Sequence, residues 1–84
     1  MTDPSGDVLP PLTPTEARLL EALRSRPGQV LSRATLVELV MPGTIVLERT
    51  IDVHIRSLRA KLGPAGKCIR TIRQGGYCYQ AEET

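Results

Sequence analysis

Apolar residues recur at helical spacing in three segments of the chain, and a glycine adjacent to a proline follows each segment. In the first segment, three leucines between residues 19 and 23 share one face, which predicts a helix over about residues 14–26. Its start carries the capping-box sequence Thr13-Pro14-Thr15-Glu16, in which the threonine and glutamate side chains each accept a bond from the other residue's backbone amide. The capping box therefore predicts where this helix begins.

The second and third segments predict two further helices. Ser32 is suited to cap a helix over roughly residues 33–40, where leucine and valine recur at helical spacing. The third helix is expected to end at Gly63-Pro64. Its apolar residues follow one another at spacings of four, three and four, and they are Ile51, Ile55, Leu58 and Leu62.

Two short β-prone segments, residues 68–73 and 77–80, follow the third helix and flank a glycine-containing loop at residues 74–76. Val30-Leu31 is long enough only for a bridging strand. The expected fold class is therefore α+β, with three helices followed by a C-terminal β-hairpin.

The length of 84 residues corresponds to one small domain, and a composition of 40% hydrophobic and 24% charged residues is typical of a globular protein. Residues 1–8 follow no helical or strand period and are expected to form a flexible lead, which assigns the folded domain to residues 9–84. No apolar run approaches the roughly 20 residues that cross a bilayer. A cytoplasmic location without membrane contact is therefore expected.

The groups that could bind a metal or catalyse a reaction are few and dispersed. Two cysteines, Cys68 and Cys78, and the single histidine His54 give no zinc-ligand spacing, so neither a metal nor a cofactor is expected. A cross-strand disulfide is conceivable, but packed thiols are the better expectation in a reducing compartment. No nucleophile, base and orienting group can be assembled, so the chain is not expected to be an enzyme.

The formal net charge of +2 is distributed unevenly along the chain. Residues 1–44 carry four basic and five acidic side chains, residues 45–80 carry seven basic and two acidic ones, and residues 81–84 carry two acidic ones. The basic region contains the third helix and the hairpin. This distribution favours a polyanionic partner, although solvated helix faces alone can produce such an excess.

A helical wheel of the third helix places a mixed face opposite the apolar one. Its residues are Arg49, Val53, Arg56, Ser57 and Ala60. Arginine can donate two bonds to a guanine edge and valine can contact a thymine methyl, so this face suits a DNA major groove, with an ordinary solvated helix as the alternative. The flanks carry polar residues where phosphate backbones would run: Thr50, His54 and Lys61 on one side and Arg59 on the other.

Two further features involve arginines. Asp52 and Arg56 stand four residues apart, which predicts a salt bridge on the third helix. Arg70 and Arg73 bracket the first strand of the hairpin, and Arg73 stands directly before the loop. An arginine at that place can enter a narrow minor groove or can protect the hairpin edge from pairing with another chain.

Four stretches of the chain resemble the winged-helix DNA-binding effector domain of OmpR/PhoB-type response regulators, which belong to bacterial two-component systems. The resemblance extends from Leu12 to about Gln80 over LTPTEARLLEAL, PGQVLSRATLVELV, ERTIDVHIRSLRAKLG and IRTIRQGGYCY. The third stretch is the most specific, because it matches the family's recognition helix nearly residue for residue. The resemblance implies a helix-turn-helix with the third helix in the major groove and the hairpin as a wing in the adjacent minor groove.

The resemblance also implies roles for individual residues in binding double-stranded DNA. It implies base contacts by Val53 and Arg56, to which the helical wheel adds Ser57. It implies phosphate contacts by Arg49, Thr50, His54, Arg59 and Thr71, to which the wheel adds Lys61. Within the wing, it implies that Arg73 enters the minor groove and that Tyr77 lies beside it.

Residues 41–47 match the loop through which relatives contact RNA polymerase, which implies roles for Met41, Gly43, Thr44 and Val46. Three residues depart from the family pattern. Ser57 stands where many members carry a second arginine, Met41 replaces a frequent tryptophan, and Cys78 replaces a basic wing residue. The change at Ser57 favours weaker or differently specified DNA binding.

Family members have a four-stranded sheet before the first helix, but only twelve residues precede Thr13 here, so neither this sheet nor a receiver domain is expected within the chain. The uncovered surface of the first helix is expected to favour self-association or to leave the domain only marginally stable, and self-association on DNA is a further expectation. These departures leave one alternative open: a winged-helix interaction module for RNA polymerase or a regulator partner, with weak or no DNA binding.

Overall fold

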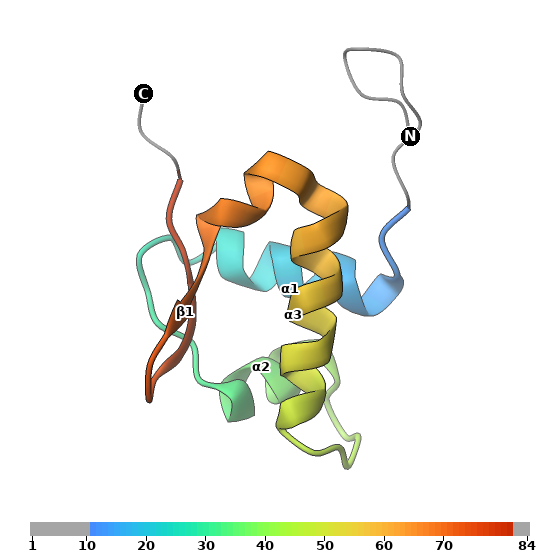
Figure 1. Cartoon of the computed structure of the whole chain (residues 1–84). Helices are drawn as coiled ribbons and strands as arrows, with labels where there is room; N and C mark the ends of the chain where they lie inside the picture. Colours follow the sequence, from blue (N-terminus) through green and yellow to red (C-terminus); the bar gives the residue numbers. More distant parts are fainter. Residues whose placement is uncertain (1–10, 82–84) are drawn as a thin grey trace.

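The computed structural model describes residues 11–81 and contains three α-helices, a 3-10 helix and a β-hairpin (Figure 1). In chain order these elements are α1 (Pro14–Arg24), α2 (Arg33–Val40), α3 (Arg49–Leu62), η1 (Gly63–Cys68), β1 (Ile69–Ile72) and β2 (Gly76–Tyr79). Among the described helices, none is long and apolar enough to cross a membrane. The expected α+β fold is confirmed, whereas the expected lead at residues 1–8 lies outside the described residues.

α1 begins at the capping box that the sequence predicts. Thr13 Oγ1 accepts from the Glu16 amide at 3.1 Å, and Glu16 Oε1 accepts from the Thr13 amide at 2.9 Å. The helix ends at Arg24, two residues before the predicted end. The reason is that the Arg26 amide bonds to the Leu23 carbonyl in a tighter turn, while Pro27 disfavours helical backbone at the residue before it.

α2 spans the predicted residues, and Ser32 caps it by accepting from the Thr35 amide at 3.0 Å. Between α3 and the hairpin lies η1, which the sequence analysis did not predict, so that Cys68 belongs to η1 and not to the first strand. A Cβ at Gly66 would come within 2.6 Å of the Arg59 carbonyl oxygen. The chain therefore folds back closely on α3 before β1 begins.

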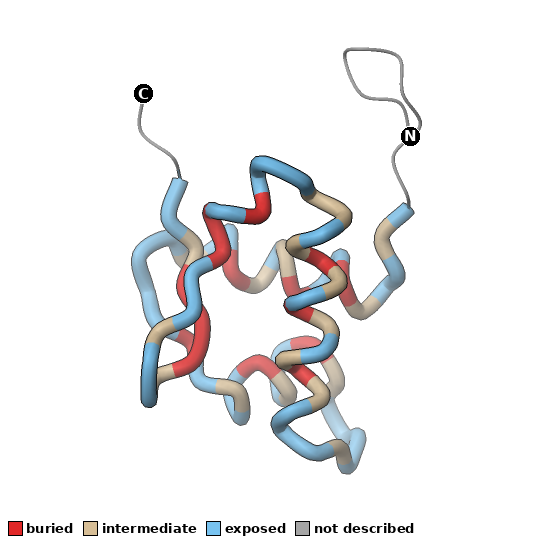
Figure 2. The backbone as a smooth tube through the Cα atoms, in the orientation of Figure 1, coloured by how far each residue is buried: buried red, intermediate tan, exposed pale blue. Residues whose placement is uncertain are grey.

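The core lies where the helices meet the hairpin, and Figure 2 shows buried positions along both the helices and the hairpin. Its side chains are aliphatic with one exception, as expected of a chain with two aromatic residues. They are Leu19, Leu23, Leu31, Leu36, Val40, Ile51, Ile55, Leu58, Ile69 and Tyr77. Because α3 contributes three residues to this core, its opposite face is left at the surface.

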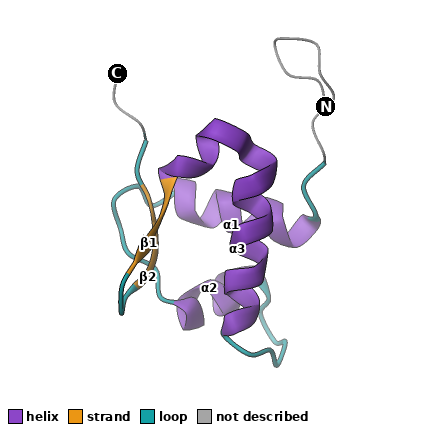
Figure 3. Cartoon of the chain, viewed as in Figure 1, coloured by secondary structure: helices purple, strands orange, loops and turns teal. Residues whose placement is uncertain are grey.

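The hairpin is tied to the start of α2 (Figure 3). β1 and β2 pair in antiparallel register from Ile69 opposite Tyr79 to Ile72 opposite Gly76. On the other edge of β2, the Leu31 amide donates to the Tyr77 carbonyl at 2.8 Å, and the Tyr77 amide donates to the Leu31 carbonyl at 2.9 Å. The predicted bridging strand is confirmed, and it fixes the hairpin relative to the helices.

Candidate nucleic-acid interface

α3 crosses in front of α1 in the view of Figure 1, and its residues include an exposed face of mixed character. Its apolar residues Ile51, Ile55 and Leu58 are fully buried. On the opposite side, the Val53 residue is 67% exposed to solvent. The predicted outer face is confirmed for four exposed residues: Arg49, Val53, Arg56 and Ala60.

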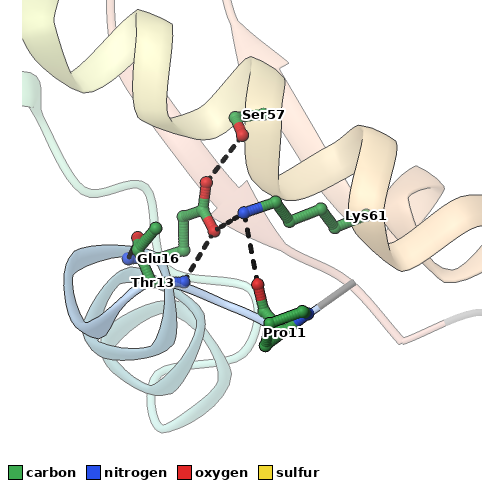
Figure 4. Close-up of polar contacts among 5 residues, drawn as sticks. All are labelled: Pro11, Thr13, Glu16, Ser57 and Lys61. Atoms are coloured by element: carbon green, nitrogen blue, oxygen red, sulfur yellow. Dashed lines mark hydrogen bonds and ion pairs between the residues drawn. The ribbon is translucent and has the colours of Figure 1, made fainter. Parts of the chain in front are cut away.

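The flank of α3 that faces α1 is occupied by contacts within the protein (Figure 4). Ser57 Oγ donates to Glu16 Oε2 at 2.6 Å, and Lys61 Nζ donates to Glu16 Oε1 at 2.7 Å and to the Pro11 carbonyl at 3.3 Å. The assignment of Ser57 to the outer face is wrong, because its hydroxyl turns inward to satisfy a buried carboxylate. The Lys61 ammonium was predicted to contact a phosphate, but in the folded protein it is paired with the Glu16 carboxylate.

Glu16 is charged although only 2% of its surface is exposed. Burial raises the pKa of its carboxyl group, but bonds from Lys61, Ser57 and the Thr13 amide outweigh burial and lower the pKa from 4.5 to about 2. At neutral pH the carboxylate is therefore ionised, and its bonds to Ser57 and Lys61 tie α1 to α3. Electrostatic attraction from the Lys61 ammonium lowers the pKa further.

The flank of α3 that faces the hairpin holds a second polar cluster. Asp52 Oδ1 accepts from Arg33 Nε at 2.7 Å and also from the Tyr77 hydroxyl. The predicted salt bridge between Asp52 and Arg56 is wrong, because the carboxylate instead joins α2 to β2 while Arg56 stays exposed. Burial raises the pKa of Asp52, but the bonds from Tyr77 and Arg33 outweigh burial and hold it below its ordinary value.

Tyr77 belongs to this cluster and to the core. Its surface is only 4% exposed, and its place beside the minor groove stays a prediction. The Cζ atoms of Arg33 and Arg59 lie over its ring, at 5.5 and 5.6 Å from the centroid. Burial and the bond donated to Asp52 raise the pKa of Tyr77, so the hydroxyl remains a donor at neutral pH.

Arg59 joins α3 to β1. Its Nε and Nη2 atoms donate to the Ile69 carbonyl at 2.9 and 2.7 Å, and Nη2 also donates to Thr71 Oγ1 at 2.7 Å. The sequence analysis placed Arg59 and Lys61 on opposite flanks of α3. This is confirmed, because Arg59 faces the hairpin whereas Lys61 faces α1. The guanidinium thus holds the hairpin against α3.

Arg33 is the member of this cluster that the sequence analysis missed. It is the first residue of α2, and its partner Asp52 lies 19 residues further along the chain. No local pattern pairs two such residues, since helical spacing relates only side chains three or four positions apart. The pairing arises when α2 and α3 pack against each other.

The remaining predicted DNA-facing residues lie on α3 and the hairpin. Thr50 and His54 are half-buried on α3, and Thr71 is exposed on β1. Arg73 is exposed in the turn between the strands, next to Gln74, which has a positive φ of 63°. The arginine therefore stands at the end of the hairpin, outside the core.

The connection over residues 41–47 is open to solvent at its centre. Ile45 is fully exposed and Leu47 is 61% exposed, whereas Met41 packs against the core. The other residues predicted for this loop are Gly43 and Thr44, which are exposed, and Val46, which is half-buried. Two large apolar side chains of the loop thus have no cover among the described residues.

Cys68 and Cys78 are free thiols and both are buried, which confirms that they are packed and not joined. The strand register pairs Cys78 with Arg70. Cys68 precedes β1, where its carbonyl accepts from the Gln80 amide at 2.8 Å. The two cysteines are therefore not opposite each other.

The arrangement of α2, α3 and the hairpin defines a winged helix-turn-helix domain, and solved structures of this class superpose on the chain. The DNA-binding domain of Bacillus subtilis CssR has a TM-score of 0.79 and 26% identity, over 94% of this chain and 88% of that one. The DNA-binding domain of the response regulator AdeR, solved in complex with an intercistronic region, has a TM-score of 0.78 and 29% identity, over 96% and 83%.

The sequence profile described as "Transcriptional regulatory protein, C terminal" matches residues 8–79. The chain belongs to this family of OmpR/PhoB-type effector domains, as the sequence resemblance implied. It is 45% identical over 73 residues to the phosphate regulon transcriptional regulatory protein PhoB of Rhizobium meliloti, which is 83% of this chain and 32% of that protein. It is 46% identical over 71 residues to the transcriptional regulatory protein CseB of Streptomyces coelicolor, and this match covers 83% of this chain and 30% of CseB. The chain spans about a third of the length of these curated relatives.

Proposed function

We propose that this domain binds double-stranded DNA in a sequence-specific manner as the output domain of a bacterial response regulator, in the cytoplasm. The observation that carries the proposal is the exposed face of α3, where two arginines flank an exposed valine on a helix whose opposite side is fully buried. Such a face can enter a major groove, because none of its four exposed side chains is acidic and two of them, Val53 and Ala60, are small. The relatives AdeR and RstA were solved in complex with DNA, which supports the same partner here.

The roles follow from position on α3 and the hairpin. Val53 and Arg56 point away from the core and are assigned to base edges, while Arg49 is assigned to a phosphate together with Thr50 and His54. Thr71 is assigned to the backbone, and Arg73, at the end of the hairpin, to the minor groove.

Substitutions of single arginines test this proposal. Arg56→Ala should cost about 1 to 3 kcal/mol on the preferred duplex and relax the preference at one base position. Arg49→Ala should instead weaken binding to all duplexes alike and reduce the slope of log K against log salt by about 0.9. Arg18→Ala is the matched control, since Arg18 is exposed on α1 on the side away from the core.

The measurement is fluorescence anisotropy with a duplex selected from a random library and with an unrelated duplex, each at several salt concentrations. Absence of salt-dependent binding to any duplex would overturn the proposal. Arg59→Ala is less suitable as a phosphate probe, because Arg59 also holds β1 and its loss would loosen the hairpin.

The exposed loop at residues 41–47 supports a second contact, with RNA polymerase. Fully exposed Ile45 and largely exposed Leu47 are the apolar groups that a protein partner could cover. NMR spectra of the domain with polymerase and, separately, with duplex DNA distinguish this contact from DNA binding. Signal changes confined to residues 41–47 with polymerase, and none on α3 with DNA, would favour the alternative of a protein-interaction module.

Self-association on DNA remains a prediction. A shallow depression on α1, lined by residues that include half-buried Leu12 and Leu20 together with Arg24, is the surface on which a second copy could rest. Sedimentation velocity of the free domain and of its DNA complex measures the association. A monomer at high protein concentration and a single domain per duplex would contradict it.

A further inference from the structure

We propose that Arg33, the first residue of α2, is a further DNA-backbone contact, and that Asp52 and Tyr77 hold its guanidinium ready for a phosphate. The inference rests on the proposed function, because it assigns a new residue to the same DNA-binding surface. The three residues come from three elements, α2, α3 and β2.

The guanidinium of Arg33 is bonded on one side only. Its Nε donates to Asp52 Oδ1 at 2.7 Å, and its Cζ lies 5.5 Å from the centroid of the Tyr77 ring. Among the described residues, the one strong bond of the guanidinium is that from Nε to Asp52, with the Tyr77 oxygen nearby, and the side chain keeps 34% of its surface exposed. A planar guanidinium held through Nε presents its other edge as a two-pronged donor, which is the geometry that binds a phosphate.

The position of this cluster matches the path that a DNA strand would take. The major and minor grooves of a duplex are separated by one sugar–phosphate strand. If α3 lies in the major groove and the hairpin in the adjacent minor groove, that strand must cross the junction between α3 and the hairpin. Tyr77 lies at this junction, with Arg33 and Arg59 on its ring.

Asp52 gives the cluster its rigidity. Two guanidinium groups near one ring repel each other, and the carboxylate offsets this repulsion while fixing the orientation of Arg33 through Nε. The Tyr77 hydroxyl bonds to the same carboxylate oxygen and so fixes Asp52 in turn. A side chain held in place before binding loses less conformational entropy when it meets a phosphate.

The salt dependence of DNA binding separates a phosphate contact from a structural role. Loss of one phosphate contact should reduce the slope of log K against log salt by about 0.9 and weaken binding about 5- to 10-fold near 0.1 M salt. We expect both changes for Arg33→Ala on an unrelated duplex as well as on the selected one. Arg33→Lys keeps the charge but loses the two-pronged donor, so it should recover the slope and only part of the affinity.

Arg18→Ala removes the same charge from the exposed side of α1, outside the proposed DNA surface, and should change neither quantity. Thermal unfolding of each variant shows whether it is folded. If Arg33→Ala does not fold, Arg33→Lys still tests the inference. A weaker affinity of Arg33→Ala with an unchanged slope would overturn the inference and leave Arg33 with a purely structural role. If the unsubstituted domain shows no salt-dependent binding, the proposed function fails instead.

A set of duplexes that each carry one uncharged methylphosphonate locates the contact. The unsubstituted domain should be weakened by the modification at the strand between the two grooves, and Arg33→Ala should be insensitive at that one position while remaining sensitive at others. An identical interference pattern for the two proteins would also overturn the inference.

Discussion

Glu16 is the residue whose chemistry depends most on its surroundings. A carboxylate with 2% exposure is costly unless its charge is compensated. Here compensation comes from the Lys61 ammonium, the Ser57 hydroxyl and the Thr13 amide, which together lower the pKa of Glu16 to about 2. Because the folded protein prefers the ionised form more strongly than the unfolded chain does, Glu16 stabilises the fold above pH 4.5, and this stabilisation is lost as the pH falls toward 2.

Glu16→Gln should therefore lower the free energy of unfolding at neutral pH by about 3 kcal/mol, since the shift in pKa corresponds to a difference of that order. The difference in the free energy of unfolding between Glu16→Gln and the unsubstituted protein should shrink as the pH is lowered from about 4.5 to about 2. Urea unfolding across this pH range measures it. Glu21→Gln is the control, because Glu21 is exposed on the same helix, and a difference for Glu16→Gln that is independent of pH would contradict the explanation.

At the scale of elements, the hairpin depends on a close approach between β2 and the chain before α2. Gly76 has a φ of 129°, and a Cβ there would lie 2.1 Å from the Leu31 carbonyl oxygen and 2.8 Å from the Ser32 Cα. Both neighbours are backbone atoms that cannot move aside. Glycine at residue 76 thus permits the bridge between Leu31 and Tyr77 that positions the hairpin beside α3.

We expect Gly76→Ala to lower the melting temperature by more than about 10 °C, because displacing the bridge should cost over about 2 kcal/mol in a domain of this size. Gly75→Ala is the matched control. A Cβ at Gly75 would meet only the side chains of Ile72 and Val30, at 3.1 Å, and these can adjust. Equal losses for the two substitutions would show that the contact with Leu31 does not govern hairpin docking.

At the scale of the whole molecule, the two proposed binding surfaces belong to separate parts of the chain. The proposed DNA surface consists of α3, the hairpin and the start of α2, whereas the apolar loop at residues 41–47 joins α2 to α3 at the lower end of the view in Figure 1. Ile45 is fully exposed and makes no contribution to the core. Substitutions in the loop should therefore change the affinity for RNA polymerase without changing the affinity for DNA.

Ile45→Ser should weaken binding to RNA polymerase while leaving DNA affinity within about twofold and stability within about 0.5 kcal/mol, as is usual for an exposed position. A neutral substitution is chosen so that the charge facing DNA does not change. Arg56→Ala should show the reverse pattern, and anisotropy with labelled duplex and with labelled domain plus polymerase measures the two affinities. Loss of both affinities in Ile45→Ser would indicate that the surfaces are not independent.

The local features of this protein could be predicted from its sequence. The capping box at Thr13, the bounds of α2 and the buried side of α3 all depend on residues within about one helical turn of each other, and for such neighbours sequence spacing is spatial proximity. The exposed face with Val53 and Arg56 follows from the same periodicity. The order of three helices and a hairpin, and with it the family, was therefore determined by the sequence alone.

The partners of the polar side chains were decided only by tertiary structure. Ser57 and Lys61 reach Glu16 across 41 and 45 residues, and Tyr77 reaches Asp52 across 25. Helical geometry could predict the flank of α3 on which a residue lies, and it could suggest a partner four positions away on the same helix. It could not predict bonds to other elements, because a buried carboxylate accepts from the donors that packing places beside it. Packing of α1, α2 and the hairpin around α3 thus turned Ser57 and Lys61 toward Glu16, buried Tyr77 and paired Arg33 with Asp52.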